Sequence, residues 1–425
     1  MSVSKQIFSS ALLILAVQFG ASGQAARTPF SSFGLGQIYG NALTHNQGSG
    51  GLGISNPDYF YLNNMNPALL IYNNVTVFEA GFIGEQRSVI GDTVTEKTGG
   101  GNLNYLAMGF PVMRTKWAMG IGLMPYSAVN YSLGYQSPVE NSTNTVDVLE
   151  QGSGGLNQLY WSNGLRIHPN VSVGIKSTYF FSAIVNEYTS TLTETSQQVQ
   201  YATNIYDRQS FSGFGFSGGL SFRLDSLFKK KDFQFNVGLV YDFKTEVRTK
   251  FYERFERRNA AGILDSVTLI NNIPGYTTIP QTIAGGISFG KNLSWLVGVD
   301  YTFHDYSQFE SFNGDTQGGT SGYQMVLGGK FIPDAGSISN YLKRITYRTG
   351  VSLSEAPYLI NGSKLRDFGI NFGLSLPVNR ISSLDLAFKF GQRGDLQTNG
   401  IEENYFKLYF GVTFNDQWFI KRRFD

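Results

Sequence analysis

Long segments of the sequence alternate between apolar and polar or small residues with a period of two. In 233–243 the odd-numbered residues are Phe, Val, Leu or Tyr, whereas most even-numbered ones are Gln, Asn, Gly or Asp. The same alternation recurs in 295–304, 384–390 and 406–414. Each segment is predicted to be a β-strand with one apolar face. Because several run to ten residues or more, against about 5–6 in soluble sheets, they favour an all-β transmembrane barrel over a soluble sandwich or propeller.

The connections between these segments alternate in length, as they do in outer-membrane barrels with long external loops and short periplasmic turns. Longer polar stretches lie near 91–101, 137–155, 190–207, 256–275, 308–321, 358–363 and 394–402. Tighter connections lie at 114–116, 168–170, 225–232, 290–292, 334–343 and 377–382. We therefore predict an antiparallel barrel of about fourteen strands with both chain termini periplasmic.

The N-terminal residues have the features of a secretory signal peptide. Lys5 precedes the apolar run 7–19, and small residues follow at 20–23, so cleavage is expected near residues 23–24. The run is shorter than the ~20 residues that a membrane-spanning helix needs. Together with the barrel, it predicts the outer membrane of a Gram-negative bacterium, with outer-membrane lipid around the protein.

Composition excludes several classes of protein. The chain has no cysteine among its 425 residues, so no disulfide framework is possible. Charged residues make up 15%, against about a quarter in soluble proteins, and beyond the signal no run of eighteen apolar residues predicts a membrane-spanning helix. A formal charge of +2 gives no reason to expect nucleic acid as a partner.

The segment between the expected cleavage site and the first strand does not alternate, and it is rich in glycine and aromatic residues. A disordered leader would be polar and charged, so we expect this segment to pack inside the barrel as a plug. The predicted organisation is a signal peptide (1–23), a plug or hatch (24–74), a barrel (75–414) and a periplasmic tail (415–425). Trp418, Phe419 and the basic run 421–423 make this tail an interfacial anchor or, alternatively, a docking site.

A family resemblance lies directly before the first strand. The segment 59–70, YFYLNNMNPALL, resembles the aromatic-x-Asn-Pro-Ala segment of the FadL family of outer-membrane long-chain fatty acid transport proteins. The stretch 404–423 is similar in character to FadL-like proteins from Bacteroidota. The resemblance implies a fourteen-stranded barrel with an N-terminal hatch in the lumen. It also implies a lateral gap beside a kinked strand, through which hydrophobic substrates leave toward the membrane.

The same resemblance supplies the candidate site residues. It implies that Tyr59, Phe60, Asn66, Pro67 and Ala68 are substrate-binding or gating residues of the hatch. The residues also predict a turn without the family, because a residue before proline avoids the helical region and an Asn side chain bonds nearby backbone.

Other residues match catalytic, phosphate-binding or metal-binding motifs in part, but the surrounding sequence supports none of these functions. Ser217 lies in a GxSxG match, but the surrounding sequence alternates as one strand and no helix follows it. The GxGxxG match at 48–53 lacks the strand and helix of a phosphate-binding unit. The three histidines, His45, His168 and His304, are too scattered in the sequence to suggest a metal site. We expect no cofactor, no metal and no catalytic residue.

Two further polar features have alternative interpretations. Asp300 and His304 fall on one inward face, which favours a polar lumen lining over a cation site or a proton relay. The run 244–258 mixes Glu with Arg and Lys, and we expect it to extend a strand into a solvated external hairpin. A partner-binding projection is the alternative.

The leading hypothesis is therefore a FadL-like, non-catalytic transport protein that passes small hydrophobic compounds through a plugged barrel. Its external loops read polar, as at 140–155 and 313–322, unlike the apolar groove of the fatty acid transporters. The alternative hypothesis is a non-catalytic barrel subunit of a larger outer-membrane assembly or secretion complex, with other outer-membrane proteins as partners. A lipid hydrolase would rest only on Ser217.

Overall fold

The computed structural model describes residues 24–139, 144–192, 202–225, 233–259, 262–312, 314, 319–379 and 382–416. The predicted signal peptide and most of the predicted tail, 417–425, lie outside the described residues.

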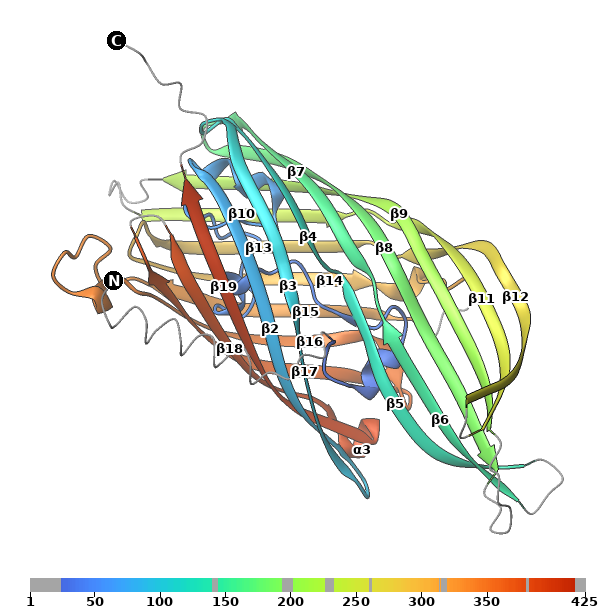
Figure 1. Ribbon diagram of the computed structural model, residues 1–425. Coiled ribbons are helices and arrows are strands. Elements are labelled where there is room, and N and C mark those ends of the chain that lie inside the picture. The colour runs from blue at the N-terminus through green and yellow to red at the C-terminus, as the bar shows by residue number, and fades with distance from the viewer. Residues whose placement is uncertain are drawn as a thin grey trace, which may run out of the picture.

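The wall is a closed barrel of fourteen antiparallel strands, which confirms the predicted fold class and strand number (Figure 1). The last strand, β19, closes the ring by pairing with β2 from Ile401↔Gly91 to Asp416↔Thr76. Four wall strands are each divided in two, as β4 with β5, β6 with β7, β10 with β11 and β12 with β13. The strands are β2 (Thr76–Gly91), β3 (Thr95–Met113), β4 (Trp117–Pro125), β5 (Ser127–Pro138), β6 (Thr145–Gly154), β7 (Asn157–His168), β8 (Val171–Leu192), β9 (Ala202–Asp225), β10 (Phe233–Asp242), β11 (Thr245–Asn259), β12 (Gly262–Ile279), β13 (Thr282–Lys291), β14 (Trp295–Asp305), β15 (Ser321–Phe331), β16 (Thr346–Ile360), β17 (Ser363–Pro377), β18 (Ser383–Asp395) and β19 (Ile401–Asp416).

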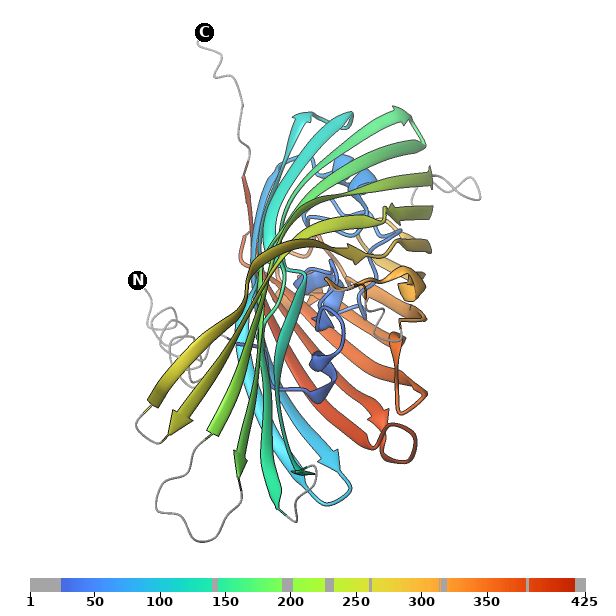
Figure 2. The same cartoon turned by 90° about the vertical axis from the view of Figure 1, so that its right-hand side faces the viewer.

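The N-terminal segment 24–75 lies inside this wall, drawn in blue in Figure 2. Most of its side chains are buried. Its elements are short: η1 (Pro29–Ser32), β1 (Gln37–Ile38), α2 (Thr44–Gln47) and η2 (Pro67–Tyr72). The remaining helical turns lie in connections between wall strands: η4 (Tyr306–Gln308), η5 (Tyr341–Arg344) and α3 (Leu396–Asn399). Among the described residues, no helix is long and apolar enough to cross a membrane.

The strand register follows the predicted alternation. In β10, Gln234 and Asn236 are buried inside the barrel, whereas Leu239 on the opposite face is half exposed. Outward aromatic residues gather near the end with the tight turns, where Trp295 packs edge-on against Phe233. This arrangement suits a wall with apolar groups in lipid and polar groups in the lumen.

Several predicted external loops are strands instead. The stretches 95–101, 145–154 and 262–275 all lie within paired strands. Their polar residues indicated loops, but polarity does not end a strand whose backbone groups keep a hydrogen-bonded neighbour. At the other end, the connection 332–345 is longer than the predicted tight turn and contains η5.

Candidate functional site

The predicted turn at Asn66 is present and joins the N-terminal segment to the wall. Asn66 precedes η2, and its Oδ1 accepts a hydrogen bond from the Ala68 N–H at 3.0 Å. Its Nδ2 donates to the carbonyl oxygens of Ile54 (2.9 Å) and Leu220 (3.1 Å). The side chain is fully buried, so all of these bonds are shielded from water.

Glycines in the wall make room for this turn. A Cβ on Gly174 of β8 would lie 2.4 Å from the Ala68 nitrogen, and one on Gly219 of β9 would lie 2.4 Å from the Asn66 Oδ1. Beside them, the Ser172 hydroxyl donates to the Ala68 carbonyl oxygen at 2.9 Å. Any side chain at these two glycine positions would collide with the turn. Glycine therefore lets the wall pack directly against the turn.

The two predicted aromatic residues occupy different surroundings. The Tyr59 hydroxyl accepts a hydrogen bond from Arg223 at 2.9 Å, and its ring packs edge-on against Tyr72 at the end of η2. The Phe60 carbonyl oxygen accepts a bond from the Asn415 side chain in β19 at 3.0 Å. Tyr59 thus lies with the turn helix, whereas Phe60 contacts the opposite side of the wall. That these residues bind or gate a substrate stays a prediction.

Buried carboxylates hold the rest of the segment. Asp300 accepts the backbone N–H groups of Gly53 (2.7 Å) and Ile54 (2.8 Å), and Glu79 accepts that of Leu62 at 2.7 Å. His304 instead contacts the Thr282 hydroxyl at 3.2 Å. Asp300 and His304 therefore serve separate polar contacts of the lumen lining. The described residues contain no group of three or more His, Asp or Glu placed to hold a metal ion.

An ion pair ties the segment to β15 as well. The Asp58 carboxylate lies 2.6 Å from the Lys330 ammonium. Burial alone would raise the pKa of Asp58, but the charge and hydrogen bond of Lys330 outweigh it and hold this pKa below its usual range. A lowered folded-state pKa means that the pair stabilises the protein above the ordinary pKa of Asp, and that this contribution is lost as the pH falls through the lowered value.

The wall has an opening between β3 and β5. β3 pairs with β4 only from Leu106 to Met113, so within the described residues its edge from Thr95 to Tyr105 has no wall strand beside it on that side. β5 pairs with β6, and its other edge pairs, in the part of the chain that the structure describes, with the two-residue β1 from the lumen. The opening follows from the break between β4 and β5, which turns β5 away from β3.

Special backbone positions produce this break. Pro125 ends β4, and Gly154 and Gly155 follow each other at the matching break between β6 and β7 with φ of 105° and 135°. A Cβ on Gly155 would lie 2.3 Å from the Ser127 carbonyl oxygen. These residues allow both strands to bend together where other side chains would be strained.

The first described residues, 24–28, fill the opening. The Gly101 N–H of β3 donates to the Gln24 carbonyl oxygen at 3.1 Å. From the other edge, the Asn130 side chain of β5 donates to the Ala25 carbonyl oxygen at 2.5 Å, and the Thr28 N–H donates to the Asn130 carbonyl oxygen at 2.9 Å. Gln24 therefore lies at the side opening.

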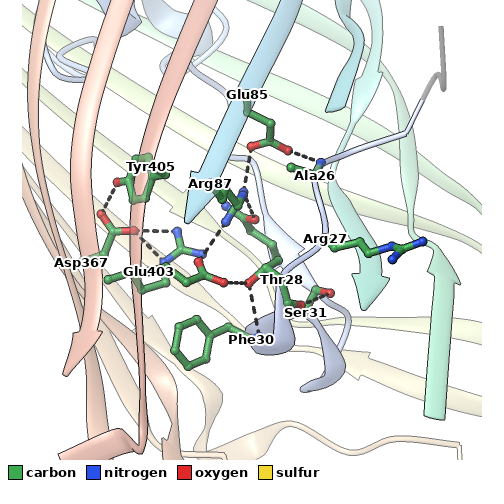
Figure 3. Close-up of polar contacts among 12 residues, drawn as sticks. Ala26, Arg27, Thr28, Phe30, Ser31, Glu85, Arg87, Asp367, Glu403 and Tyr405 are labelled. Atoms are coloured by element: carbon green, nitrogen blue, oxygen red, sulfur yellow. Dashed lines mark hydrogen bonds and ion pairs between the residues drawn. The ribbon is translucent and has the colours of Figure 1, made fainter. Parts of the chain in front are cut away.

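A buried charge cluster anchors this segment from the lumen side (Figure 3). The Arg87 guanidinium contacts Glu85 at 2.8 Å and Glu403 at 3.1 Å, and all three side chains are fully buried. Glu85 accepts the Ala26 N–H at 2.7 Å, and Glu403 accepts the Thr28 hydroxyl. Each carboxylate thus joins a wall charge to the residues that close the opening.

A cavity of about 240 Å³ lies beside loop 33–40. It combines aromatic rings with charged groups, and its lining includes loop 33–40, Tyr306, Tyr323, Tyr358, Lys389, Arg393 and Lys407. None of the five predicted site residues lines it. The period-two alternation of 384–390 and 406–414 places Lys389 and Lys407 on the inward face. The sequence pattern alone does not show that they line the same cavity.

The GxSxG match lies in the middle of a strand, as the sequence alternation indicated. Ser217 is buried on β9, which runs from Ala202 to Asp225 without the strand-to-helix turn that a nucleophile elbow needs.

Comparisons with known proteins agree with this geometry. The model of the family described as BamG matches residues 3–425. No curated protein matches the sequence significantly. Among solved structures, the CymD monoaromatic hydrocarbon channel is similar with a TM-score of 0.57 and 14% identity, over 89% of this chain and 98% of that one. A FadL homologue from Pseudomonas aeruginosa is similar with a TM-score of 0.54 and 10% identity, over 89% and 98%. The toluene transporter TodX of P. putida gives 0.54 and 13%, over 90% and 99%. The chain thus shares the fold of FadL-type channels.

Filling the glycine contact should loosen the N-terminal segment. We expect Gly174→Ala to destabilise the folded protein by about 1–3 kcal/mol, because its Cβ meets backbone. Gly218→Ala is the matched control, since a Cβ there meets nothing within 4 Å. Thermal unfolding in detergent measures the difference, and equal midpoints for the two variants would contradict the proposed fit.

Removing one anchor charge should release the residues in the opening. We expect Glu85→Gln to raise the labelling rate of a cysteine placed at Ala26 at least several-fold, because the buried Arg87 and the Ala26 N–H lose a carboxylate partner. The natural chain has no cysteine to interfere. The same cysteine in the Gly218→Ala background is the control, and unchanged labelling in Glu85→Gln would show that the cluster does not hold the segment.

Proposed function

Because the chain belongs to the BamG family and has the fold of outer-membrane channels, we propose that it passes small hydrophobic compounds across the outer membrane. The observation that carries the proposal is the opening between β3 and β5, where residues 24–28 contact both strand edges. CymD and TodX, which share the fold, are described as a monoaromatic hydrocarbon channel and a toluene transporter.

A side opening suits an apolar cargo. A compound that leaves through the wall enters lipid directly and does not have to dissolve in the aqueous periplasm. The proposed route runs from the lumen past loop 33–40 to the edges of β3 and β5. The aromatic rings in the 240 Å³ cavity supply apolar contacts, while most of its charged groups already contact one another, as Arg393 does Asp367 at 2.6 Å.

Residues 24–28 are the proposed gate, and the turn at Asn66 is the proposed fixed point. Asn66, Pro67 and Ala68 pack against backbone and glycine on several sides, so moving them would break many contacts at once. Residues 24–28 bridge two strand edges through a few hydrogen bonds and one exposed ion pair, Arg27–Glu96 at 4.0 Å. In this proposal Tyr59 and Phe60 keep the hatch attached to the wall while the N-terminal residues move.

The proposed location is the outer membrane of a Gram-negative bacterium, after removal of a signal peptide that ends before Gln24. The charge cluster of Arg87, Glu85 and Glu403 would then take up the new N-terminal residues as the barrel closes. Transport of this kind needs no catalytic residue and no cofactor.

Deleting residues 24–28 should open the side exit. We expect cells that carry this variant to take up a hydrophobic probe such as toluene several-fold faster than cells with the unaltered chain, because residues 24–28 bond to both strand edges there. Initial uptake rates at equal protein levels measure the effect. Cells with Gly218→Ala serve as control.

Uptake in cells that lack the whole protein tests the transport proposal itself. We expect slower uptake of toluene in those cells, restored by the unaltered chain. Equal uptake with and without the chain would contradict transport.

A second candidate function is a barrel subunit of a larger outer-membrane assembly. The specific observation in its favour is the long β11–β12 hairpin, whose outer strand lacks a neighbour on one edge within the described residues. Purification in mild detergent with mass spectrometry distinguishes the two candidates. Stoichiometric partner proteins would favour a subunit, and purification of the chain alone would favour a stand-alone channel.

A further inference from the structure

Strand β12 forms an unpaired edge of the wall. One side pairs with β11 along its whole length, from Asn259↔Gly262 to Thr245↔Ile279. On the other side, the described residues supply only a single bridge, Thr278↔Glu310. Figure 1 shows β12 at the border of the sheet, on the right of the view. The backbone groups that face outward from 262–277 therefore have no strand partner in the part of the chain that the structure describes.

The hairpin stands outside the lipid. Tyr241 and Phe243, in edge-on contact, are the last outward aromatic residues before it. The next outward positions in β11 are Glu246, Arg248 and Lys250, all exposed. Because charged side chains are costly on the lipid face of a barrel, this part of β11 lies beyond the hydrocarbon, and the far half of β12 lies farther out still.

The far half of β12 is unusually apolar for such a place. Ile263, Leu264, Val267 and Leu269 are 46–59% exposed, and they lie on both faces of the strand. The single charged residue of β12, Asp265, is already paired with Arg257 at 2.8 Å. Exposed apolar patches of this kind mark interaction surfaces.

Natural edge strands are usually protected by lysine, proline or a bulge. In β12 the proline, Pro274, lies in the near half close to Asn272, which has φ of 52°, and register shifts against β11 fall at 271–272, at Leu269 and at Leu264. The segment 263–270 contains neither lysine nor proline. No lysine or proline there blocks an added strand, and the residues between its two register shifts, 265–268, form its regular part.

We propose that Ile263–Ile270 is a docking strand, to which another protein at the cell surface adds an extended segment as the next strand. The occupant is polypeptide because the unpaired backbone groups need hydrogen-bond donors and acceptors, which lipid chains lack. The partner's added segment should itself be uncharged and apolar. Asp265 is neutralised by Arg257, and no other charged residue lies in Ile263–Ile270 for a charged partner to pair with.

Geometry argues against a second copy of this chain as the occupant. Two copies in one membrane would be related by an axis along the membrane normal, so their β12 strands would rise in the same direction. Strands that a two-fold axis relates within one sheet run antiparallel instead. The inference does not depend on transport, and it names the surface that the second candidate function would use.

Amide hydrogen exchange of residues 263–270 tests the proposal. We compare the full chain in outer-membrane vesicles from its own cells with the purified chain in detergent and in vesicles of outer-membrane lipid. We expect exchange at least tenfold slower in the native vesicles, because a paired edge protects its N–H groups. Equal exchange in the native and lipid-only vesicles would overturn the proposal, since lipid would then account for any protection.

Substitutions identify the edge as the cause. Val267→Lys with Leu269→Lys should abolish the slower exchange in native vesicles, because two ammonium groups would face an apolar strand. Leu149→Lys, at an exposed position on β6 away from the edge, should leave it intact. Retained protection in the double variant would overturn the proposal.

Two further readouts separate the remaining explanations. A disulfide-linked homodimer of the Leu269→Cys variant in native vesicles would indicate self-pairing and overturn the proposal. Toluene uptake by the double lysine variant should equal that of the unaltered chain, so that failure of the docking strand and failure of transport remain distinguishable. Loss of uptake in that variant would place β12 on the transport route and overturn the assignment of this edge to docking.

Discussion

The structure depends on contact between an irregular polypeptide segment and the inward face of the barrel. A segment without long helices or strands has many backbone groups to satisfy away from bulk water. The wall meets this need in two ways: glycines such as Gly174 and Gly219 let backbone approach, and inward carboxylates such as Asp300 and Glu79 accept its N–H groups. The same face therefore provides both space and hydrogen bonds.

The opening in the wall follows from the same rule. Breaking the ladder between β3 and β5 exposes strand edges, and residues 24–28 restore part of the lost hydrogen bonding from inside. Glu85 and Glu403 bind both Arg87 and these residues. The buried charge cluster in the lumen therefore helps to hold the side opening closed. A protein with this arrangement has one segment that can leave while the remainder stays in place.

The sequence predicted the features that depend on local pattern. Period-two alternation assigned Gln234 and Asn236 to the lumen, and the Asn66-Pro67 pair predicted the turn that the structure contains. The family resemblance implied a lateral gap beside a kinked strand, but the sequence pattern did not locate the breaks at Pro125 and Gly155, because such a break depends on which neighbouring strands stop pairing. The free edge of β12 was also missed, since its polar residues read as a loop although pairing with β11 continues the strand. Likewise, nothing in 24–28 by itself indicates a position between two wall strands.

The central claim is that residues 24–28 open and close a side exit for hydrophobic compounds. The most direct test joins Arg27→Cys to Glu96→Cys, an exposed neighbouring pair across the opening, with a short thiol cross-linker that contains a reducible bond. Toluene uptake is then measured before cross-linking, after it and after reduction. Uptake that is lost on cross-linking and recovered on reduction is the predicted result. Uptake that stays the same in all three states would contradict the account.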